Sequence, residues 1–288
     1  VVFPATISVD GGAMKARKAA KAAANPDQPK RKRGMYNLRG GLGALAAGVV
    51  DWLPAGTVRL GVAVNDVAKT PTGFALSTDG SDGPGTLHAA RVVMATPAAA
   101  ATGLLQQLQP AAAEQLAGVR CCAMAVVHLG GPDGAVTVPQ GFGVLIQRGS
   151  GIRPLGLLMP SSLFAGRAPE GYWLHSVFIG GATDPEAATL PDDELVALAR
   201  DAQRQIFSLP DDKDALPMTF HEIVRWSEAI PQYVVGHRDL VGGALALVER
   251  DLPGLTLAGS YVDGVSIADA AASGLAAVER LASLGDGQ

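Results

Sequence analysis

The spacing of hydrophobic positions along this chain predicts helices alternating with short strands. Helical periodicity is clearest over 192–207, where apolar residues gather on one side behind a Pro191-Asp192 start. Further helices are predicted over 44–53, 96–108, 240–250 and 267–284. Apolar runs bounded by turn residues predict strands over 35–38, 58–64, 74–78, 92–94, 123–129, 142–147, 155–159, 173–179, 223–225 and 255–257. We expect the strands between 123 and 179 to form a mostly antiparallel sheet.

The composition is that of a globular protein with a substantial core. The chain has 288 residues, 48% hydrophobic and 17% charged, which is enough for two domains or one large one. Its net charge of −4 argues against a general nucleic-acid surface, so no nucleic-acid partner is expected. The apolar runs, such as 92–105, are interrupted and too short to span a bilayer.

The two cysteines of the chain, Cys121 and Cys122, are adjacent. Neighbouring cysteines rarely form a disulfide, because the bond requires Cα atoms farther apart than adjacent residues normally sit. With His128 as the nearest histidine in sequence, a zinc site is not expected. We interpret the pair as reduced thiols of a cytoplasmic protein, with one or both in a core strand.

The N-terminal region differs from the rest of the chain. It begins at Val1 rather than Met, and we interpret the chain as a fragment or a processed piece. Residues 11–33 combine a Lys- and Arg-rich helix former with the basic tract Lys30-Arg31-Lys32-Arg33. Such a tract could contact a nucleic acid or a membrane surface. A solvated helix end followed by a flexible linker is the interpretation we favour.

Two glycine-rich segments carry candidate chemistry. Gly41-Leu42-Gly43-Ala44-Leu45-Ala46 matches the G-x-G-x-x-A pattern of dinucleotide-binding turns, with Asp66 further along. The preceding strand is short and polar, however, whereas a central parallel strand is a buried Val/Ile-rich run. The second segment runs from strand 255–257 through Gly259 and Gly264 into a helix. Bare backbone followed by a helix N-terminus suits a phosphate-bearing or flat aromatic cofactor.

Several strings together resemble protoporphyrinogen oxidases of the flavin amine oxidase superfamily. The resemblance covers about residues 34–284, and the set of motifs is more specific than any single glycine pattern. In it, Arg39-Gly40-Gly41-Leu42 is similar to a turn whose following helix supports the flavin domain. The matching strings are Asn37–Leu45, Val92–Pro97, Gln140–Leu145, Ser161–Pro169, Phe178–Gly181, Trp226–His237 (W-x-x-A-I-P-Q-Y-x-x-G-H) and Leu257–Ile267.

The resemblance implies a mixed α/β fold. Part of an FAD-binding Rossmann-like domain, residues 34–105 and 238–288, would carry an inserted sheet-and-helix substrate-binding domain over 106–237. Residues 1–33 would be the tail of a helical substrate- or membrane-binding region plus a basic linker. The N-terminal segment that holds the ADP part of FAD in the family would be missing, so we expect the chain alone to bind FAD poorly.

The resemblance also implies a set of site residues. No Ser-His-Asp order, paired acid site or metal cluster emerges, so the chemistry is expected from the flavin, and no catalytic side chain is named. For Phe142, Leu145 and Trp226 the alternative to a binding role is a purely structural one. For Thr96 the alternative is that it caps a helix. The tetrapyrrole-lining residues would be Phe142 and Leu145. The FAD-binding residues would be Val64, Ala95, Thr96, Trp226, Gly259, Val265, Ser266 and Ile267.

The activity implied is FAD-dependent, oxygen-linked oxidation of protoporphyrinogen IX to protoporphyrin IX in haem biosynthesis. Alternatives are coproporphyrinogen III oxidation to coproporphyrin III, another flavin amine oxidase-like reaction, and a non-catalytic fragment. The partners implied are the porphyrinogen, oxygen and the missing N-terminal segment. A membrane surface and a second copy in a homodimer are further options. The expected location is cytoplasmic, with peripheral attachment to the cytoplasmic membrane as an option.

Overall fold

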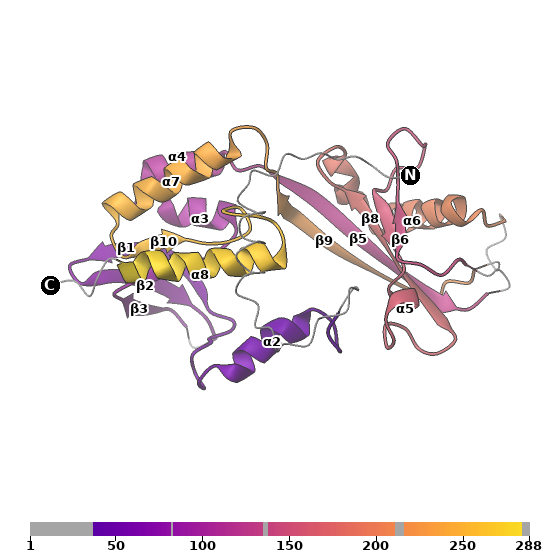
Figure 1. The fold of residues 1–288 in the computed structure, drawn as a ribbon, viewed down its shortest axis with the longest axis horizontal. Helices are drawn as coiled ribbons and strands as arrows, with labels where there is room; N and C mark the ends of the chain where they lie inside the picture. Colours follow the sequence, from indigo (N-terminus) through magenta and orange to yellow (C-terminus); the bar gives the residue numbers. More distant parts are fainter. Residues whose placement is uncertain (1–36, 82, 135–137, 211–215, 284–288) are drawn as a thin grey trace, which may run out of the picture. The chain divides into compact units, whose positions relative to one another are not determined.

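The computed structural model describes residues 37–81, 83–134, 138–210 and 216–283. The chain divides into two compact units, residues 1–49 and 50–288. Gly40 and Gly41 form a turn at φ of +82° and +98°, a region that favours glycine. Helix α2 (Gly43–Trp52) follows with exposed side chains and includes residues on both sides of the 49/50 division (Figure 1). The basic segment predicted over 1–33 lies outside the described residues. So does half of the strand predicted over 35–38, and residues 37 and 38 are not in a strand.

The second unit begins with an antiparallel sheet of β1 (Ala63–Thr70), β2 (Gly73–Asp79) and β3 (Gly85–Ala89). Its buried side chains include Val67 and Phe74. The strand predicted over 58–64 was wrong in position. Gly56 and Gly61 adopt positive φ, so the chain turns there and extended structure starts only at residue 63.

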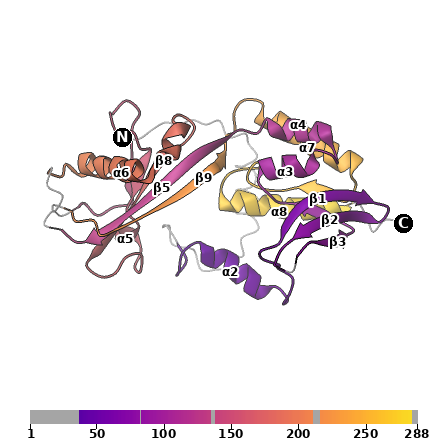
Figure 2. The same cartoon turned by 180° about the vertical axis from the view of Figure 1, so that it is seen from behind.

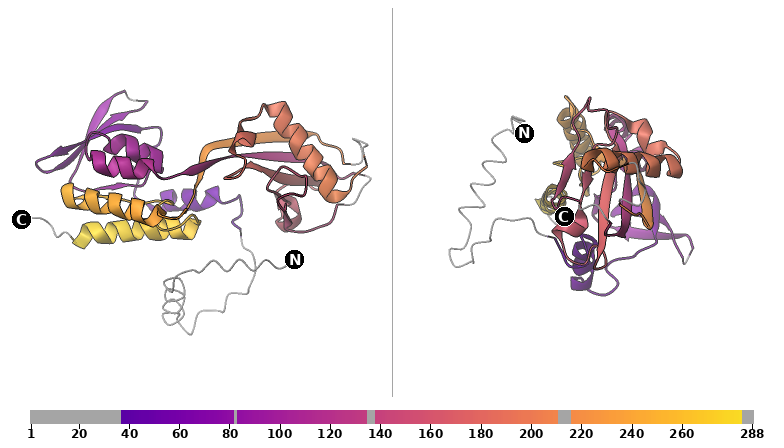
Figure 3. Two further views of the ribbon diagram at one scale, coloured as in Figure 1. Left: turned by 90° about the horizontal axis from the view of Figure 1, so that it is seen from above. Right: turned by 90° about the vertical axis from the view of Figure 1, so that its right-hand side faces the viewer.

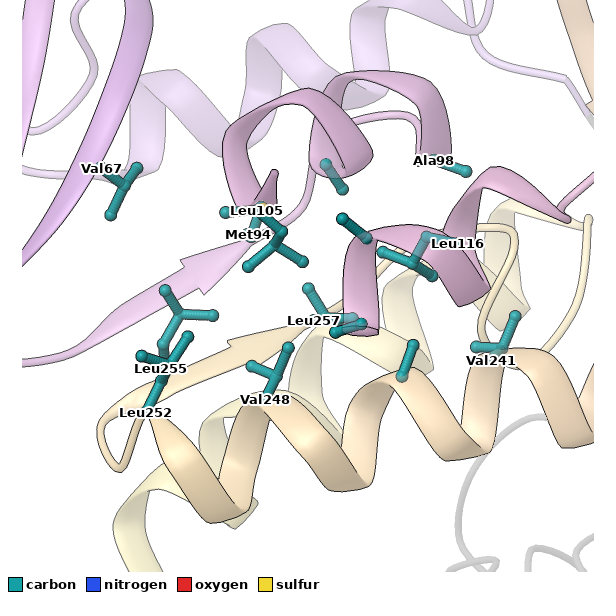
Figure 4. Packing of buried hydrophobic residues seen from close by; sticks show 14 of the residues in the cluster. Val67, Met94, Ala98, Leu105, Leu116, Val241, Val248, Leu252, Leu255 and Leu257 are labelled. Atoms are coloured by element: carbon teal, nitrogen blue, oxygen red, sulfur yellow. The ribbon is translucent and has the colours of Figure 1, made fainter. Parts of the chain in front are cut away.

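A parallel strand pair lies at the centre of the first core. β4 (Val92–Met94) and β10 (Leu255–Leu257) pair over three residues each. Helices α3 (Ala98–Leu105), α4 (Pro110–Ala117) and α7 (His237–Asp251) bury their apolar sides in one cluster with these strands (Figure 4). The helix predicted over 96–108 is α3, which is shorter than predicted at both ends, and α4 is a further helix that was not predicted. The Gln109 side chain accepts the Ala111 N–H and Pro110 starts α4, so two helices form.

The second core is built on a five-stranded antiparallel sheet in the order β6-β7-β8-β5-β9. The two longest strands, β5 and β9, run side by side (Figures 1 and 2). Helix α6 (Asp192–Phe207) has the bounds that the periodicity predicted. The sheet strands are β5 (Cys121–Pro132), β6 (Gly143–Leu145), β7 (Gly156–Leu158), β8 (Tyr172–Gly180) and β9 (Phe220–Pro231), and the short helices are α5 (Pro160–Leu163) and η1 (Pro185–Thr189).

The two faces of this sheet differ in what covers them. Paired residues of an antiparallel sheet share a face, so the register assigns each side chain to one side. The first face, with Val127 and Val177, packs against Leu195 and Ala199 of α6. The other face, called here the open face, is formed by Met124, Val126, His128 and Gly130 of β5, Leu174, Ser176 and Phe178 of β8, Gly156 and Leu158 of β7, Leu145 of β6, and Phe220, Glu222, Val224 and Trp226 of β9.

The chain leaves the first core through β5 and returns to it through β9 (Figure 3). Helix α4 packs into the first core, so this core extends beyond the predicted division at 105/106. The last helix, α8 (Ile267–Ser283), contacts β10 and β4. None of the helices among the described residues combines the length and apolar composition needed to cross a bilayer.

Candidate functional site

The carboxyl ends of β4 and β10 lie at one edge of the first core. Met94 pairs with Leu257, and the Ala258 N–H continues the ladder by donating to the Met94 carbonyl oxygen at 3.0 Å. The next residues, Ala95 and Thr96 after β4 and Gly259 after β10, therefore emerge together. Ligands of open α/β sheets bind where the carboxyl ends of parallel strands meet. The parallel pairing thus brings three of the predicted cofactor residues to the position where a ligand would bind.

The loop 259–266 requires glycine at two positions. Gly259 has φ of +135° and Gly264 φ of +154°, so both lie in a region that other residues rarely adopt. A Cβ on Gly264 would stand 2.6 Å from a carboxylate oxygen of Asp269, which leaves no room for one. The Gly259 N–H donates to the Ser273 hydroxyl at 3.0 Å, so α8 fixes the start of the loop.

Ser266 caps α8 and fixes the other end of the loop. Its hydroxyl oxygen accepts the Asp269 N–H at 3.0 Å, and its hydroxyl group donates to the Asp269 carboxylate at 2.6 Å. On either side of this cap the side chains of Val265 and Ile267 are more than half exposed, at 54% and 56%. The loop therefore presents two apolar side chains beside the positive end of a helix dipole.

Thr96 supplies an unused polar atom at the same edge. Its hydroxyl oxygen is buried and has no hydrogen-bond partner in the part of the chain that the structure describes. The interpretation of Thr96 as a helix cap was wrong, because Pro97 occupies the N-cap position of α3 and no side chain caps that helix. Buried polar groups normally have partners, so this hydroxyl is available to a bound group.

Tyr233 and His237 hold the loop from its other side. The Tyr233 hydroxyl donates to the Ser260 carbonyl oxygen at 2.8 Å, and its ring lies 4.0 Å from that of His237 between centroids. His237 is buried, and its Nε2 bonds the Tyr261 carbonyl oxygen at 2.8 Å. Burial raises the pKa of Tyr233, and burial raises that of Tyr261 to about 12. Neither tyrosine was predicted as a site residue, although Tyr233 stands within the W-x-x-A-I-P-Q-Y-x-x-G-H string.

Leu145 and Trp226 share the open face of the five-stranded sheet. Leu145 aligns with Val224 through successive cross-strand pairs, and Trp226 is one position further along the same face. Four strand spacings of about 4.8 Å separate their strands, roughly 19 Å. Leu145 is 87% exposed and Trp226 46%, so neither is a buried core residue.

The other two predicted residues lie elsewhere. Phe142 precedes β6, is 52% exposed, and its carbonyl oxygen accepts the Met159 N–H at 3.0 Å. Val64 is on β1 at a β-bulge and is 37% exposed. Cys121 and Cys122 are free thiols on β5, as predicted. Among the described residues, no cluster of His, Cys, Asp or Glu could hold a metal ion.

Residues 7–282 match the model of the family described as flavin containing amine oxidoreductase. The chain belongs to this family. It is 34% identical over 275 residues to protoporphyrinogen oxidase 1, chloroplastic, of Spinacia oleracea, covering 90% of this chain and 48% of the relative. It is 33% identical to coproporphyrinogen III oxidase of Propionibacterium freudenreichii subsp. freudenreichii, covering 81% and 42%. The chain thus spans about half the length of these family members.

Solved structures of other flavin-family members share the fold. A proposed protoporphyrinogen oxidase from Exiguobacterium sp. 255-15 superposes with a TM-score of 0.72 at 21% identity, covering 86% of this chain and 51% of the other. Cyclohexylamine oxidase from Brevibacterium oxydans IH-35A gives 0.60 at 17% identity, covering 85% and 52%. These likenesses confirm the predicted mixed α/β fold of the family.

The edge formed by β4, β10 and the loop 259–266 fits a flavin. A flavin is a flat, largely apolar ring with polar atoms along one side. Val265 and Ile267 offer apolar contact, and Thr96 offers a buried hydroxyl that has no partner among the described residues.

Proposed function

We propose that this chain forms part of an FAD-dependent enzyme that oxidises protoporphyrinogen IX to protoporphyrin IX. The observation that carries the proposal is the edge where Thr96, Gly259 and the loop to Ser266 meet. Protoporphyrinogen oxidases at 31–34% identity over 90% of this chain support the substrate assignment. Coproporphyrinogen III is the second candidate substrate, because coproporphyrinogen oxidases at 27% and 33% identity are also among the relatives.

In this proposal the chain binds and orients rather than reacts. Gly259 and Gly264 give the loop its shape beside the ring, and the Thr96 hydroxyl bonds one of its polar atoms. Val265 and Ile267 cover one part of the ring and exclude water from it. The chemistry that FAD supplies when bound is uptake of hydrogen from the porphyrinogen, which oxygen finally accepts. On the sheet, Phe142 and Leu145 provide apolar contact for the tetrapyrrole.

We also propose that further polypeptide completes this site. Helix α8 carries an exposed apolar stripe that includes Ile267, Leu275 and Val278, the last two 69% and 57% exposed. Parallel strands such as β4 and β10 normally belong to larger sheets covered on both faces. The relatives are about twice as long as the matched region, so their additional segment is the partner that fits this stripe.

The free thiols of Cys121 and Cys122 support a reducing, cytoplasmic location.

The first test is a visible absorption spectrum after soaking the chain in FAD and desalting it. We expect a nearly colourless protein from the chain alone and flavin bands once the complementary half of a relative is added. Tight stoichiometric FAD binding by the chain alone would contradict the need for further polypeptide. If no flavin is retained with the complement either, the flavin site itself is refuted. The coloured complex is then assayed with both porphyrinogens, by the fluorescence of the porphyrin product.

A matched pair of variants links the spectrum to the site. Gly259→Ala strains the start of the loop, because φ there is +135° and the added Cβ would stand 3.3 Å from the Tyr261 side chain. Gly274→Ala makes the same change on α8, where a Cβ would meet nothing. We expect the first variant to lose flavin and the second to retain it. Equal retention by both would show that flavin binding does not depend on the shape of the loop at Gly259.

A further inference from the structure

Between the levels of Leu174 and Phe178 on β8, the open face of the five-stranded sheet carries a single row of polar side chains. His128 on β5 pairs directly with Ser176 on β8 and with Glu222 on β9, and these three residues are called here the polar row. The neighbouring positions on both sides of the row are apolar. They are Leu174, Gly130 and Phe220 on one side, and Phe178, Val126 and Val224 on the other.

An antiparallel sheet face that meets water is normally polar, in alternation with an apolar face that meets the core. Here α6 covers one apolar face, and the open face is apolar as well. A second apolar face indicates a second cover. The face is also hollowed beside the polar row, where a cavity of about 380 Å³ includes Gly130, Leu174 and Phe220 in its lining.

A cover over this face must provide partners for the polar row. Burying a carboxylate or an imidazole without a hydrogen bond costs free energy, so an entirely apolar cover would be unfavourable. Ser176 already bonds His128, with 2.9 Å between the Ser176 oxygen and Nδ1. In the part of the chain that the structure describes, the oxygens of Glu222 and the Nε2 atom of His128 have no hydrogen-bond partner. Burial lowers the pKa of His128, against an opposing effect of the Glu222 charge, so the imidazole is neutral near pH 7.

The chemistry that fits is a broad apolar molecule with N–H donors near its middle and carboxylates only at its rim. Glu222 accepts N–H groups and repels carboxylates. A porphyrinogen has this form, because its pyrrole N–H groups lie inside the ring and its acidic side chains lie outside. We infer that the polar row binds the pyrrole N–H groups of the porphyrinogen, while the apolar remainder of the open face contacts the macrocycle. This inference rests on the proposed function.

The row would also orient the substrate and help to release the product. Repulsion from Glu222 directs the carboxylates away from the centre of the sheet, towards its margins. The aromatic product carries fewer pyrrole N–H groups than the porphyrinogen, so it leaves Glu222 with fewer donors. The row therefore favours the reduced macrocycle over the oxidised one.

Binding can be measured on the chain itself, without flavin. Trp226 lies on the open face and is 46% exposed, so a macrocycle on this face should quench its fluorescence. Anaerobic titration with protoporphyrinogen IX gives the Kd of the wild-type chain and of Glu222→Leu. We expect Glu222→Leu to raise Kd about tenfold or more, as for loss of hydrogen bonds to a charged group. Glu222→Gln, which keeps one oxygen acceptor, should fall between the two.

The matched control is Glu194→Leu, the same change at an exposed position of α6, which covers the other face of the sheet. Its Kd should equal that of the wild type. The inference is overturned if Glu222→Leu binds as the wild type does, if Glu194→Leu weakens binding equally, or if the wild-type chain does not bind the porphyrinogen either alone or with the complementary half of a relative added. The flavin spectrum tests the proposed function separately. Failure of the polar row to bind porphyrinogen therefore does not count against the flavin site, and loss of the flavin site does not count against the polar row.

Discussion

The buried histidine of the second core makes the stability of this protein sensitive to acid. His175 lies on β8, is 3% exposed, and stacks at 4.9 Å between ring centroids on Trp173. Its Nδ1 atom is 2.7 Å from the side-chain nitrogen of Gln203, whose oxygen accepts from Arg200 at 2.7 Å. The glutamine amide therefore donates to Nδ1, which holds the imidazole neutral in a defined orientation.

The size of the effect follows from two pKa values. Burial lowers the pKa of His175 from 6.5 to about 4. The unfolded chain therefore takes up a proton near pH 6.5, whereas the folded protein resists it until about pH 4. The contribution of the neutral His175 side chain to the free energy of unfolding is complete above pH 6.5 and is lost as the pH falls below that value. At pH 5 the loss in free energy of unfolding is about 2 kcal/mol.

The assay is chemical denaturation followed by Trp173 fluorescence at about pH 7 and about pH 5. Trp173 is a direct reporter because it is 6% exposed and stacks on the histidine. Other groups also titrate, so the measured quantity is the difference between the wild type and His175→Gln, which offers Gln203 an acceptor but does not ionise. Wild-type stability should fall on acidification by about 2 kcal/mol more than that of the variant.

The control is His221→Gln, the same change at an exposed histidine of β9. This control should follow the wild type at both pH values. The reasoning is refuted if the wild type and His175→Gln lose equal stability between these pH values, since the folded state would then bind the proton as readily as the unfolded chain does.

Three further predictions concern the edge beside the loop 259–266, each checked by chemical denaturation. Gly264→Ala should destabilise the protein by about 1–3 kcal/mol, because its Cβ meets Asp269, whereas Gly274→Ala within α8 should stabilise it by about 0.5–1 kcal/mol. Leu257→Ala should cost about 2–5 kcal/mol, since this side chain of β10 is fully buried. Arg280→Ala should cost about 1–3 kcal/mol, because the guanidinium donates to the Leu257 carbonyl oxygen at 2.8 Å. A loss below these ranges in Gly264→Ala, Leu257→Ala or Arg280→Ala, or a loss of stability in Gly274→Ala, would contradict the corresponding prediction.

Local patterns in the sequence predicted most of the secondary structure. The period of 3.6 over 192–207 predicted α6, and apolar runs predicted the core of each strand from β5 to β8. The strand predicted over 58–64 was misplaced because the chain turns at Gly61, and helix α4, which begins at Pro110, was not predicted. β9 was predicted as three residues but spans Phe220–Pro231, because pairing with β5 extends it through the polar residues.

The sequence by itself determined the family and the glycine-rich segment from Gly259 to Ile267. Those signals are local: short strings of residue types at set spacing, which persist whatever lies opposite them. Only the tertiary structure decided that β10 pairs with β4 and so brings Gly259 beside Thr96. Only the register of the sheet decided that Leu145 and Trp226 share one face with the polar row. Such pairings depend on packing between segments far apart in the chain, and no local pattern specifies which strand becomes the neighbour of another.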